Sequence, residues 1–477
     1  MKTSKLTFAV LFGNRGFFPA SLIASARAEM SETLQRLGHR VLMMDAAATR
    51  HGAVETPEEG RKFAQFLDEN RREIDGVILT LPNFGDENGV IAALRDARMP
   101  ILVHAYPDTL TAMSPDQRRD SFCGKLSVMD IFCQNGVAFT ALKPHVVHPA
   151  RPEFVRNIDH FARLCRVVRG MKSLTVGAIG ARTTAFKTVR IDELTLQSHG
   201  ITVETVDLSD VFARARELQE SDAKVQAKAA RLQDYTSWNT APKAAFDNLV
   251  RLAVAIDDVV AELAADAVSI RCWLEIQKEF GVSPCVLLSE MNDRGLPAAC
   301  ELDTGSAVLM YALQQASNDV AACLDWNNNY GDHPNKCILF HCGPVPQRMM
   351  AGKGNVVDHA ILVPVLGAGR SYGCNAGRIA PMPFTFGGLL TKAGRVNVYL
   401  GEGDITADPI PQDFFGCAGV AEIPNLQDVL QTIGSTGHRH HVAVAPGRCA
   451  APLREALEKY LGFDVTPVGY GTGEVRT

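Results

Sequence analysis

The sequence lacks the signals that mark several common classes of protein. None of its 477 residues fall in a run approaching the roughly 18 apolar residues that a membrane span needs. Lys and Arg total 48 and Asp and Glu total 53, so the formal net charge is −5, and no block of like charge occurs. Proteins that bind nucleic acid or anionic membranes carry a basic surface, and this chain has none in its sequence. We therefore expect neither a nucleic-acid partner nor a membrane partner.

The 12 cysteines are scattered along the chain, and no two have the CxxC spacing of a zinc ribbon or a redox dithiol. Most lie within apolar runs, as Cys285 and Cys323 do, where a reduced cysteine behaves as a small hydrophobic residue. We interpret the cysteines as core residues of a cytoplasmic protein, because a reducing compartment keeps thiols free.

Nucleotide-binding motifs are absent as well. Residues 177–182 read GAIGAR, which lacks the GxGxxG spacing of a dinucleotide fingerprint. Residues 366–373 lack the Gly-Lys-Ser/Thr that ends a Walker A motif, and neither GxSxG nor HExxH occurs. The sequence therefore predicts no nucleotide cofactor.

Length and hydrophobic periodicity predict three domains, since domains usually hold roughly 100–200 residues. Short apolar runs alternate with helical stretches over residues 1–150 and again over 151–355, which predicts two doubly wound, Rossmann/flavodoxin-like α/β domains. Helical periodicity fades afterwards, so residues 356–477 are predicted to form a mostly β domain. Short apolar runs at Pro284–Leu288 and Ile361–Leu366 are predicted to be strands.

The residues that best indicate chemistry lie late in the middle domain. Asp325 and His341 each follow a short apolar run, and Glu301 precedes them, with about one β/α unit between neighbours. Ligands bind at the carboxyl ends of strands in open α/β sheets, so we expect adjacent strand ends to bring these side chains together. Two carboxylates with imidazoles form an oxygen-rich site that suits Mn²⁺ or Mg²⁺. Each carboxylate alone also fits a helix cap or a solvated turn.

A group of histidines near the carboxyl terminus provides further candidates. His438, His440 and His441 immediately precede an apolar run. Side chains alternate along a strand, so we expect His440 and His441 to point to opposite faces and one of them to enter a site. A solvated, pH-sensitive loop or an adventitious metal patch remain the alternatives.

These motifs together resemble the L-fucose isomerase-like family, which is related more distantly to L-arabinose isomerase. The resemblance rests on ELD at 301–303, DW at 325–326, FHCG at 340–343, HHVAV at 440–444, GNRGFFP at 13–19 and FCGKLSVMDIF at 122–132. The resemblance spans essentially the whole chain, and the last two of these motifs resemble the shorter members of the family.

The resemblance implies a Mn²⁺-dependent aldose–ketose isomerase acting on an open-chain monosaccharide through an enediolate, with Mg²⁺ and Co²⁺ as other candidate metals. Glu301, Asp325 and His441 match the family's metal ligands, and the two carboxylates match its acid/base pair. His341 stands where arabinose isomerases have an additional ligand. The family also implies a homo-oligomer (trimer, tetramer or hexamer) with sites at subunit interfaces.

Candidate substrate contacts are Arg15 (across a subunit interface), His440, Tyr372 and Thr385. The sugar itself is left open, because short family members act on varied sugars, including sulfonated ones such as sulfoquinovose. An anionic group would need a basic partner, and Arg15, Arg182 and Arg370 lie in predicted loops. Alternatives to an isomerase are another metal-assisted carbohydrate enzyme, such as an epimerase or a lyase, and a non-catalytic sugar-binding protein.

Overall fold

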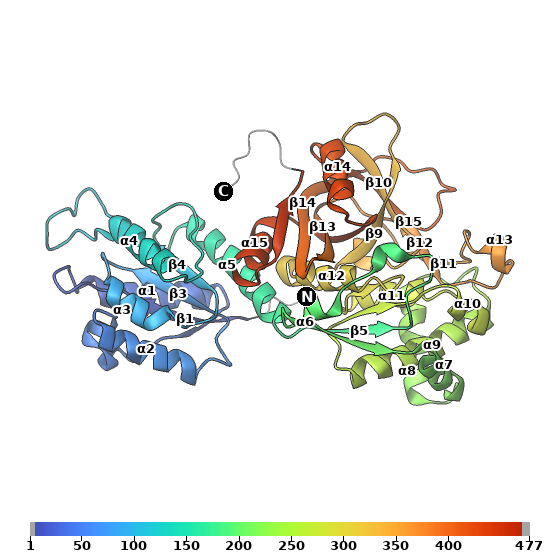
Figure 1. Ribbon diagram of the computed structural model, residues 1–477, viewed down its shortest axis with the longest axis horizontal. Helices are drawn as coiled ribbons and strands as arrows, with labels where there is room; N and C mark the ends of the chain where they lie inside the picture. The colour runs from blue at the N-terminus through green and yellow to red at the C-terminus, as the bar shows by residue number, and fades with distance from the viewer. Residues whose placement is uncertain (1–4, 470–477) are drawn as a thin grey trace. The chain divides into compact units, whose positions relative to one another are not determined.

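The structure, a computed structural model, describes residues 5–469 (Figure 1). The chain divides into two compact units. One extends to Arg169 and takes in Lys459–Gly462, and the other contains Gly170–Glu458 and the chain from Phe463 onward. Among the described helices, none has the length and apolar character needed to cross a bilayer.

The first unit contains a parallel four-stranded sheet in the order β2-β1-β3-β4. Its strands are β1 (Thr7–Phe12), β2 (Arg40–Leu42), β3 (Gly76–Leu81) and β4 (Ile101–Ala105). Its helices are α1 (Leu22–Arg36), α2 (Pro57–Glu69), α3 (Glu87–Leu94), α4 (Ser121–Gln134) and α5 (Pro152–Met171). Strands β1, β3 and β4 are buried along their whole length, as expected of parallel strands covered on both faces.

The second unit begins with another parallel sheet, in the order β6-β5-β7-β8. Its strands are β5 (Thr175–Ile179), β6 (Thr202–Val206), β7 (Ala267–Ile270) and β8 (Ala298–Ala299). Its helices are α6 (Glu193–Gln197), α7 (Leu208–Glu217), α8 (Ala223–Tyr235), α9 (Lys243–Glu262), α10 (Glu275–Phe280), α11 (Cys285–Asp293) and α12 (Thr304–Ser317). The predicted strand at Pro284–Leu288 is wrong, because this run opens α11. A helix buried on all sides reads as a continuous apolar run, just as a buried strand does.

The rest of the second unit is dominated by a nine-stranded, largely antiparallel sheet, hereafter the large sheet, in the order β11-β12-β15-β10-β9-β16-β13-β14-β17. Its strands are β9 (Ala322–Asn329), β10 (Lys336–His341), β11 (Asn355–Val357), β12 (Cys374–Arg378), β13 (Met382–Lys392), β14 (Arg395–Ile405), β15 (Cys417–Glu422), β16 (His441–Pro446) and β17 (Asp464–Pro467). Helices α13 (Val363–Leu366), α14 (Leu426–Thr436) and α15 (Ala450–Glu455) accompany it. The predicted class, two α/β regions followed by a mostly β region, is confirmed.

Two local features of this region differ from expectation. The predicted strand at Ile361–Leu366 is wrong, because its last four residues form the short helix α13, which has a proline in its first turn where no backbone N–H is needed. Strands β9 and β10 belong to the large sheet, although their residues fall within the predicted middle domain of residues 151–355. The sequence of the β9–β10 hairpin shows that two strands are present but does not indicate which sheet they join.

Candidate active site

Three neighbouring strands of the large sheet bring Asp325, His341 and His441 together. His441 in β16 lies opposite Asp325 in β9, and Asp325 lies opposite Phe340 in β10, one residue before His341. Asp325 stands inside β9, so the expectation that it follows a strand of an open parallel sheet is wrong. These strands are antiparallel, and cross-strand pairing rather than shared strand ends makes the side chains neighbours.

Glu301 comes from the other sheet of the same unit, in the turn between β8 and α12. Glu301 and Leu302 have φ angles of 62° and 58°, a left-handed conformation that costs free energy in residues other than glycine. The backbone N–H of Leu302 donates to Ile270 O at 3.1 Å, and Trp273 Nε1–H donates to Glu301 Oε1 at 3.0 Å. These bonds hold a strained turn in place, and strain of this kind is common at functional sites.

The four side chains converge without saturating one another's hydrogen-bonding atoms. His441 Nε2 lies 2.9 Å from Glu301 Oε2 and 3.5 Å from Asp325 Oδ1. One ligand atom each from Asp325, His341 and His441 lie within 4.8 Å of one another, as do those of Glu301, His440 and His441. Asp325 Oδ1 and His341 Nε2 are buried with no hydrogen-bond partner among the described residues. Buried polar atoms normally have partners, so this donor set fits a divalent cation with oxygen and imidazole ligands.

His441 is held in the orientation that a metal ligand needs. Its Nδ1 donates to Asp303 Oδ2 at 2.8 Å, which directs Nε2 toward Glu301 and Asp325. Burial opposes protonation of His441, but Cys323, Asp303 and Glu301 raise its pKa well above the ordinary value. A cation at this position would replace the Nε2 proton.

Asp303 and Arg439 form a fully buried pair behind His441. Burial alone would raise the pKa of Asp303, but Arg439 and His441 hold it well below the usual range. A carboxylate that orients a metal-binding histidine is a common second layer of such sites. The sequence reasoning missed both residues. Asp303 is also the N-cap of α12, and nothing in the sequence distinguishes it from an ordinary cap.

His341 is oriented differently from His441. The backbone N–H of Cys342 donates to His341 Nδ1 at 2.9 Å, so the neutral ring has its proton on Nε2, the atom that faces the cluster. A protonated nitrogen donates a hydrogen bond and does not bind a metal. His341 therefore fits a hydrogen-bond donor better than a fourth ligand.

His440 and Phe186 form one side of the cluster. The Phe186 ring centroid lies 5.7 Å from that of His441 and 5.5 Å from that of His440. The expectation that the two histidines face opposite ways is wrong, because β16 begins at His441 and His440 precedes the regular strand. Burial and the neighbouring His441 lower the pKa of His440. Phe186 lies in an irregular segment without a motif, so no pattern in the sequence indicates its role.

The other predicted substrate residues have contacts of their own. The Thr385 hydroxyl donates to Gly447 O at 2.9 Å and accepts from Cys449 N at 2.8 Å. Tyr372 O accepts from Ser283 N at 2.8 Å. Neither Thr385 nor Tyr372 hydrogen-bonds the described residues of the cluster.

Arg15 lies in the first unit. There it forms an ion pair with Glu87, and its guanidinium carbon stands 4.3 Å from the ring centroid of Phe84.

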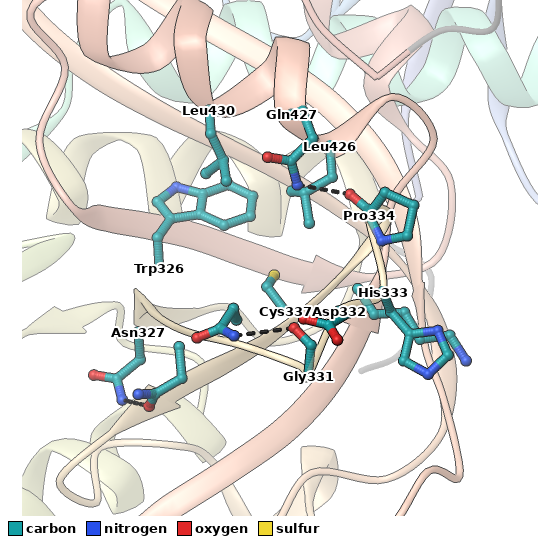
Figure 2. A pocket seen from close by; sticks show the side chains of 13 residues that line it. Trp326, Asn327, Gly331, Asp332, His333, Pro334, Cys337, Leu426, Gln427 and Leu430 are labelled. Carbon is teal, nitrogen blue, oxygen red and sulfur yellow. Dashed lines mark hydrogen bonds between the residues drawn. The ribbon is translucent and has the colours of Figure 1, made fainter.

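A separate pocket of about 490 Å³ lies at the far end of the β9–β10 hairpin (Figure 2). Trp326, the loop around His333 and the first turn of α14 line it, and Gln427 Nε2–H donates to Pro334 O at 2.8 Å. None of the clustered carboxylates and histidines lines this pocket. Side chains alternate along β9, so Trp326 points away from the face that carries Asp325.

Comparison with known proteins identifies the class of enzyme. Residues 9–172 match the N-terminal domain of fucose/sulfoquinovose isomerases, and residues 339–468 match the C-terminal domain of L-fucose isomerase. The chain is therefore an aldose–ketose sugar isomerase. It belongs to the L-fucose isomerase-like family, as its sequence motifs predict.

Curated relatives narrow the comparison further. The sulfoquinovose isomerase of Alkalicoccus urumqiensis is 23% identical over 392 residues, which are 82% of this chain and 85% of that protein. That of Priestia aryabhattai is 21% identical, covering 84% of this chain and 87% of that protein. That of Clostridium sp. (strain MSTE9) is 28% identical over 44% of this chain and 54% of its own length. Among solved structures, apo D-lactate dehydrogenase from Escherichia coli aligns with 66% of this chain and 95% of that chain at 10% identity, but its TM-score of 0.16 carries no argument.

Proposed function

We propose that this chain is a divalent-metal-dependent isomerase that interconverts sulfoquinovose, an aldose with a sulfonate at C6, and the corresponding ketose. The observation that carries the proposal is the convergence of Glu301, Asp325 and His441, in which His441 Nε2 faces both carboxylates and Asp325 Oδ1 is buried without a hydrogen-bond partner among the described residues. The choice of sugar is supported by the relatives that align with more than four-fifths of the chain, all of which are sulfoquinovose isomerases.

Glu301, Asp325 and His441 would hold the metal, with Mn²⁺ as the leading candidate and Mg²⁺ or Co²⁺ as alternatives. Their two carboxylates and one imidazole suit a hard or borderline divalent ion. A bound divalent ion would stabilise the negative charge that develops on the substrate oxygens while a C–H proton is removed.

The protein's own groups account for the movement of the proton. Although burial opposes it, His441 and His341 lower the pKa of Glu301, so this carboxylate is ionised at neutral pH and able to act as a base. One of the two carboxylates removes the proton from C2 of the open-chain aldose, and the same group or its partner returns a proton to C1. His341 Nε2–H would donate to a substrate oxygen. Phe186 would cover one side and limit the entry of water.

Arg182 is a candidate for binding the sulfonate. It lies in the same irregular segment as Phe186, which contacts His440 and His441. Its guanidinium donates to the carbonyls of Thr183 and Thr184 at 3.2 and 3.5 Å and has no carboxylate partner among the described residues. An arginine that is not already paired with a carboxylate retains donors for an anion.

Proton NMR of sulfoquinovose incubated with the Mn²⁺-loaded enzyme in deuterated water tests the proposal. Formation of the ketose supports it. A C2 epimer without ketose would indicate an epimerase, cleavage products would indicate a lyase, and an unchanged sugar would contradict the proposed substrate.

The proposal also includes Arg15 acting at the site of a neighbouring subunit. Mixing Arg15→Ala with Glu301→Gln protomers should restore some activity, whereas no recovery would confine the site to one chain.

A further inference from the structure

A second group of potential ligands in the same unit was not anticipated from the sequence. Cys285 is the first residue of α11, Cys374 is the first residue of β12, and His359 lies in the loop between β11 and α13. One ligand atom from each lies within 4.8 Å of the others. All three side chains are buried, with exposed fractions of 2%, 0% and 8% respectively. Three separate segments therefore bring two thiols and an imidazole to one point.

The separation of the two sulfurs suits a shared metal ion. Cys285 Sγ and Cys374 Sγ are 4.0 Å apart. A tetrahedral zinc ion with Zn–S bonds of about 2.3 Å holds two sulfurs about 3.8 Å apart. A disulfide would require about 2.05 Å. The observed spacing is thus close to that of a metal-bridged pair and about twice that of a disulfide.

His359 is fixed at this point by its neighbour and lacks a partner of its own. The carboxylate of Asp358 accepts from Gly369 N at 2.6 Å and from Ser371 N at 3.1 Å, which ties both ends of this loop together. His359 Nδ1 is buried and has no hydrogen-bond partner among the described residues. A buried imidazole nitrogen without a partner is costly, and coordination or a hydrogen bond would satisfy it.

A further buried thiol, Cys300, interacts with Cys285, but its sulfur does not lie within 4.8 Å of all three ligand atoms. Cys285 is the first residue of α11, so its thiol lies at the N-terminus of that helix. Thiolates are the form that binds metal, and a helix N-terminus such as that of α11 favours them.

We propose that Cys285, Cys374 and His359 bind a zinc ion. Thiolate and imidazole groups are the ligands that zinc prefers in proteins. This donor set differs from the carboxylate-rich cluster at Glu301, so the two sites would select different ions. The zinc would tie α11 to β12 and to the His359 loop.

Cobalt binding to the full-length protein tests this proposal, because Co²⁺ replaces Zn²⁺ and gives a sulfur-to-metal charge-transfer absorption only with thiolate ligands. Protein stripped of metal under reducing conditions would be titrated with Co²⁺ and then with Zn²⁺. We expect a thiolate charge-transfer band that appears with Co²⁺ and disappears when Zn²⁺ is added. We also expect the melting temperature to rise with Zn²⁺. No such band in the folded wild-type protein would overturn the proposal.

Variants locate the site. The band should be lost in Cys285→Ala and Cys374→Ala and retained in Cys417→Ala, which removes another buried thiol, one in β15 outside the cluster. It should also persist in Glu301→Gln, which keeps this test independent of the proposed isomerase activity. A band that survives both Cys285→Ala and Cys374→Ala would contradict the assignment. Loss of the band in Glu301→Gln alone would place the cobalt at the other cluster and would also overturn it.

Discussion

Replacing Asp303 with asparagine tests the electrostatic support of the proposed metal site. In the folded protein, Asp303 Oδ2 accepts from His441 Nδ1 at 2.8 Å and from Ser306 Oγ at 2.6 Å, and Oδ1 accepts from Arg439. Asparagine keeps the shape but removes the charge. Its amide group can donate to His441 Nδ1, which would favour the tautomer with the proton on Nε2 and so block the metal-binding atom.

The expected size of the effect follows from these contacts. Loss of a carboxylate behind a metal-binding histidine usually costs about 10–100-fold in metal affinity. Arg439 would also be left as an uncompensated buried charge, which costs about 3–5 kcal/mol of unfolding free energy. Mn²⁺ affinity would be measured by calorimetry and stability by urea denaturation. Ser306→Ala is the matched control, because it removes one bond to Asp303 at a cost of about 1 kcal/mol and leaves the His441 tautomer unchanged.

Two outcomes would refute this reasoning. If Asp303→Asn bound Mn²⁺ as tightly as the wild type while remaining folded, Asp303 would not control His441. If Ser306→Ala lost as much affinity as Asp303→Asn, the effect would reflect general damage to the start of α12 and not the His441 tautomer.

Three further predictions concern the reaction, the substrate and stability. Glu301→Gln should lower kcat by about 10²–10⁴-fold in sugar assays, because it removes a proton acceptor, and near-normal turnover would exclude Glu301 as the base. Arg182→Gln should raise KM for sulfoquinovose by about 10–100-fold, because it removes a charge-assisted hydrogen bond of about 1.5–3 kcal/mol, and should leave KM for uncharged aldoses unchanged. Arg190→Gln is the control. An equal rise in KM for both kinds of sugar would argue against sulfonate binding by Arg182. Burial lowers the pKa of His104 to about 3. As the pH is lowered below about 6.5, the ordinary pKa of histidine, His104 takes up a proton in the unfolded chain but not in the folded chain. The free energy of unfolding therefore decreases by about 1.4 kcal/mol for each pH unit below 6.5, or by about 2 kcal/mol in total at pH 5. Urea denaturation should show this slope in the wild type and a weaker one in His104→Gln, whereas identical slopes would contradict the assignment.

The resemblance to the L-fucose isomerase-like family was sufficient to predict that Glu301, Asp325 and His441 lie close together, because each belongs to one of its motifs. The motifs did not show how the site is built. Asp325 and His441 are paired across antiparallel strands more than one hundred residues apart in the chain, and strand pairing at that distance depends on tertiary packing. The buried Asp303–Arg439 pair was missed for a related reason, since burial turns an ordinary helix cap into an orienting group.

The proximity of two cysteines was not predicted from the sequence either. Read along the chain, they are small residues within apolar runs, and most of them are indeed buried. Cys285 and Cys374 are brought close only by the packing of α11 against β12, which no spacing rule for adjacent cysteines detects. The helix at Cys285–Asp293 was also mistaken for a strand, so its N-terminal thiol was assigned to the wrong kind of element.

Metal replacement in the wild-type enzyme tests the central claim most directly. The enzyme would be treated with EDTA, reloaded with a graded amount of Mn²⁺, and assayed for conversion of sulfoquinovose to ketose, with bound Mn²⁺ measured on the same samples. We predict that activity is lost with the metal and returns in proportion to bound Mn²⁺, and that Asp325→Asn neither binds the ion tightly nor recovers activity. Full activity after the metal has been removed, or recovery in Asp325→Asn equal to that of the wild type, would contradict a metal-dependent isomerase centred on Glu301, Asp325 and His441.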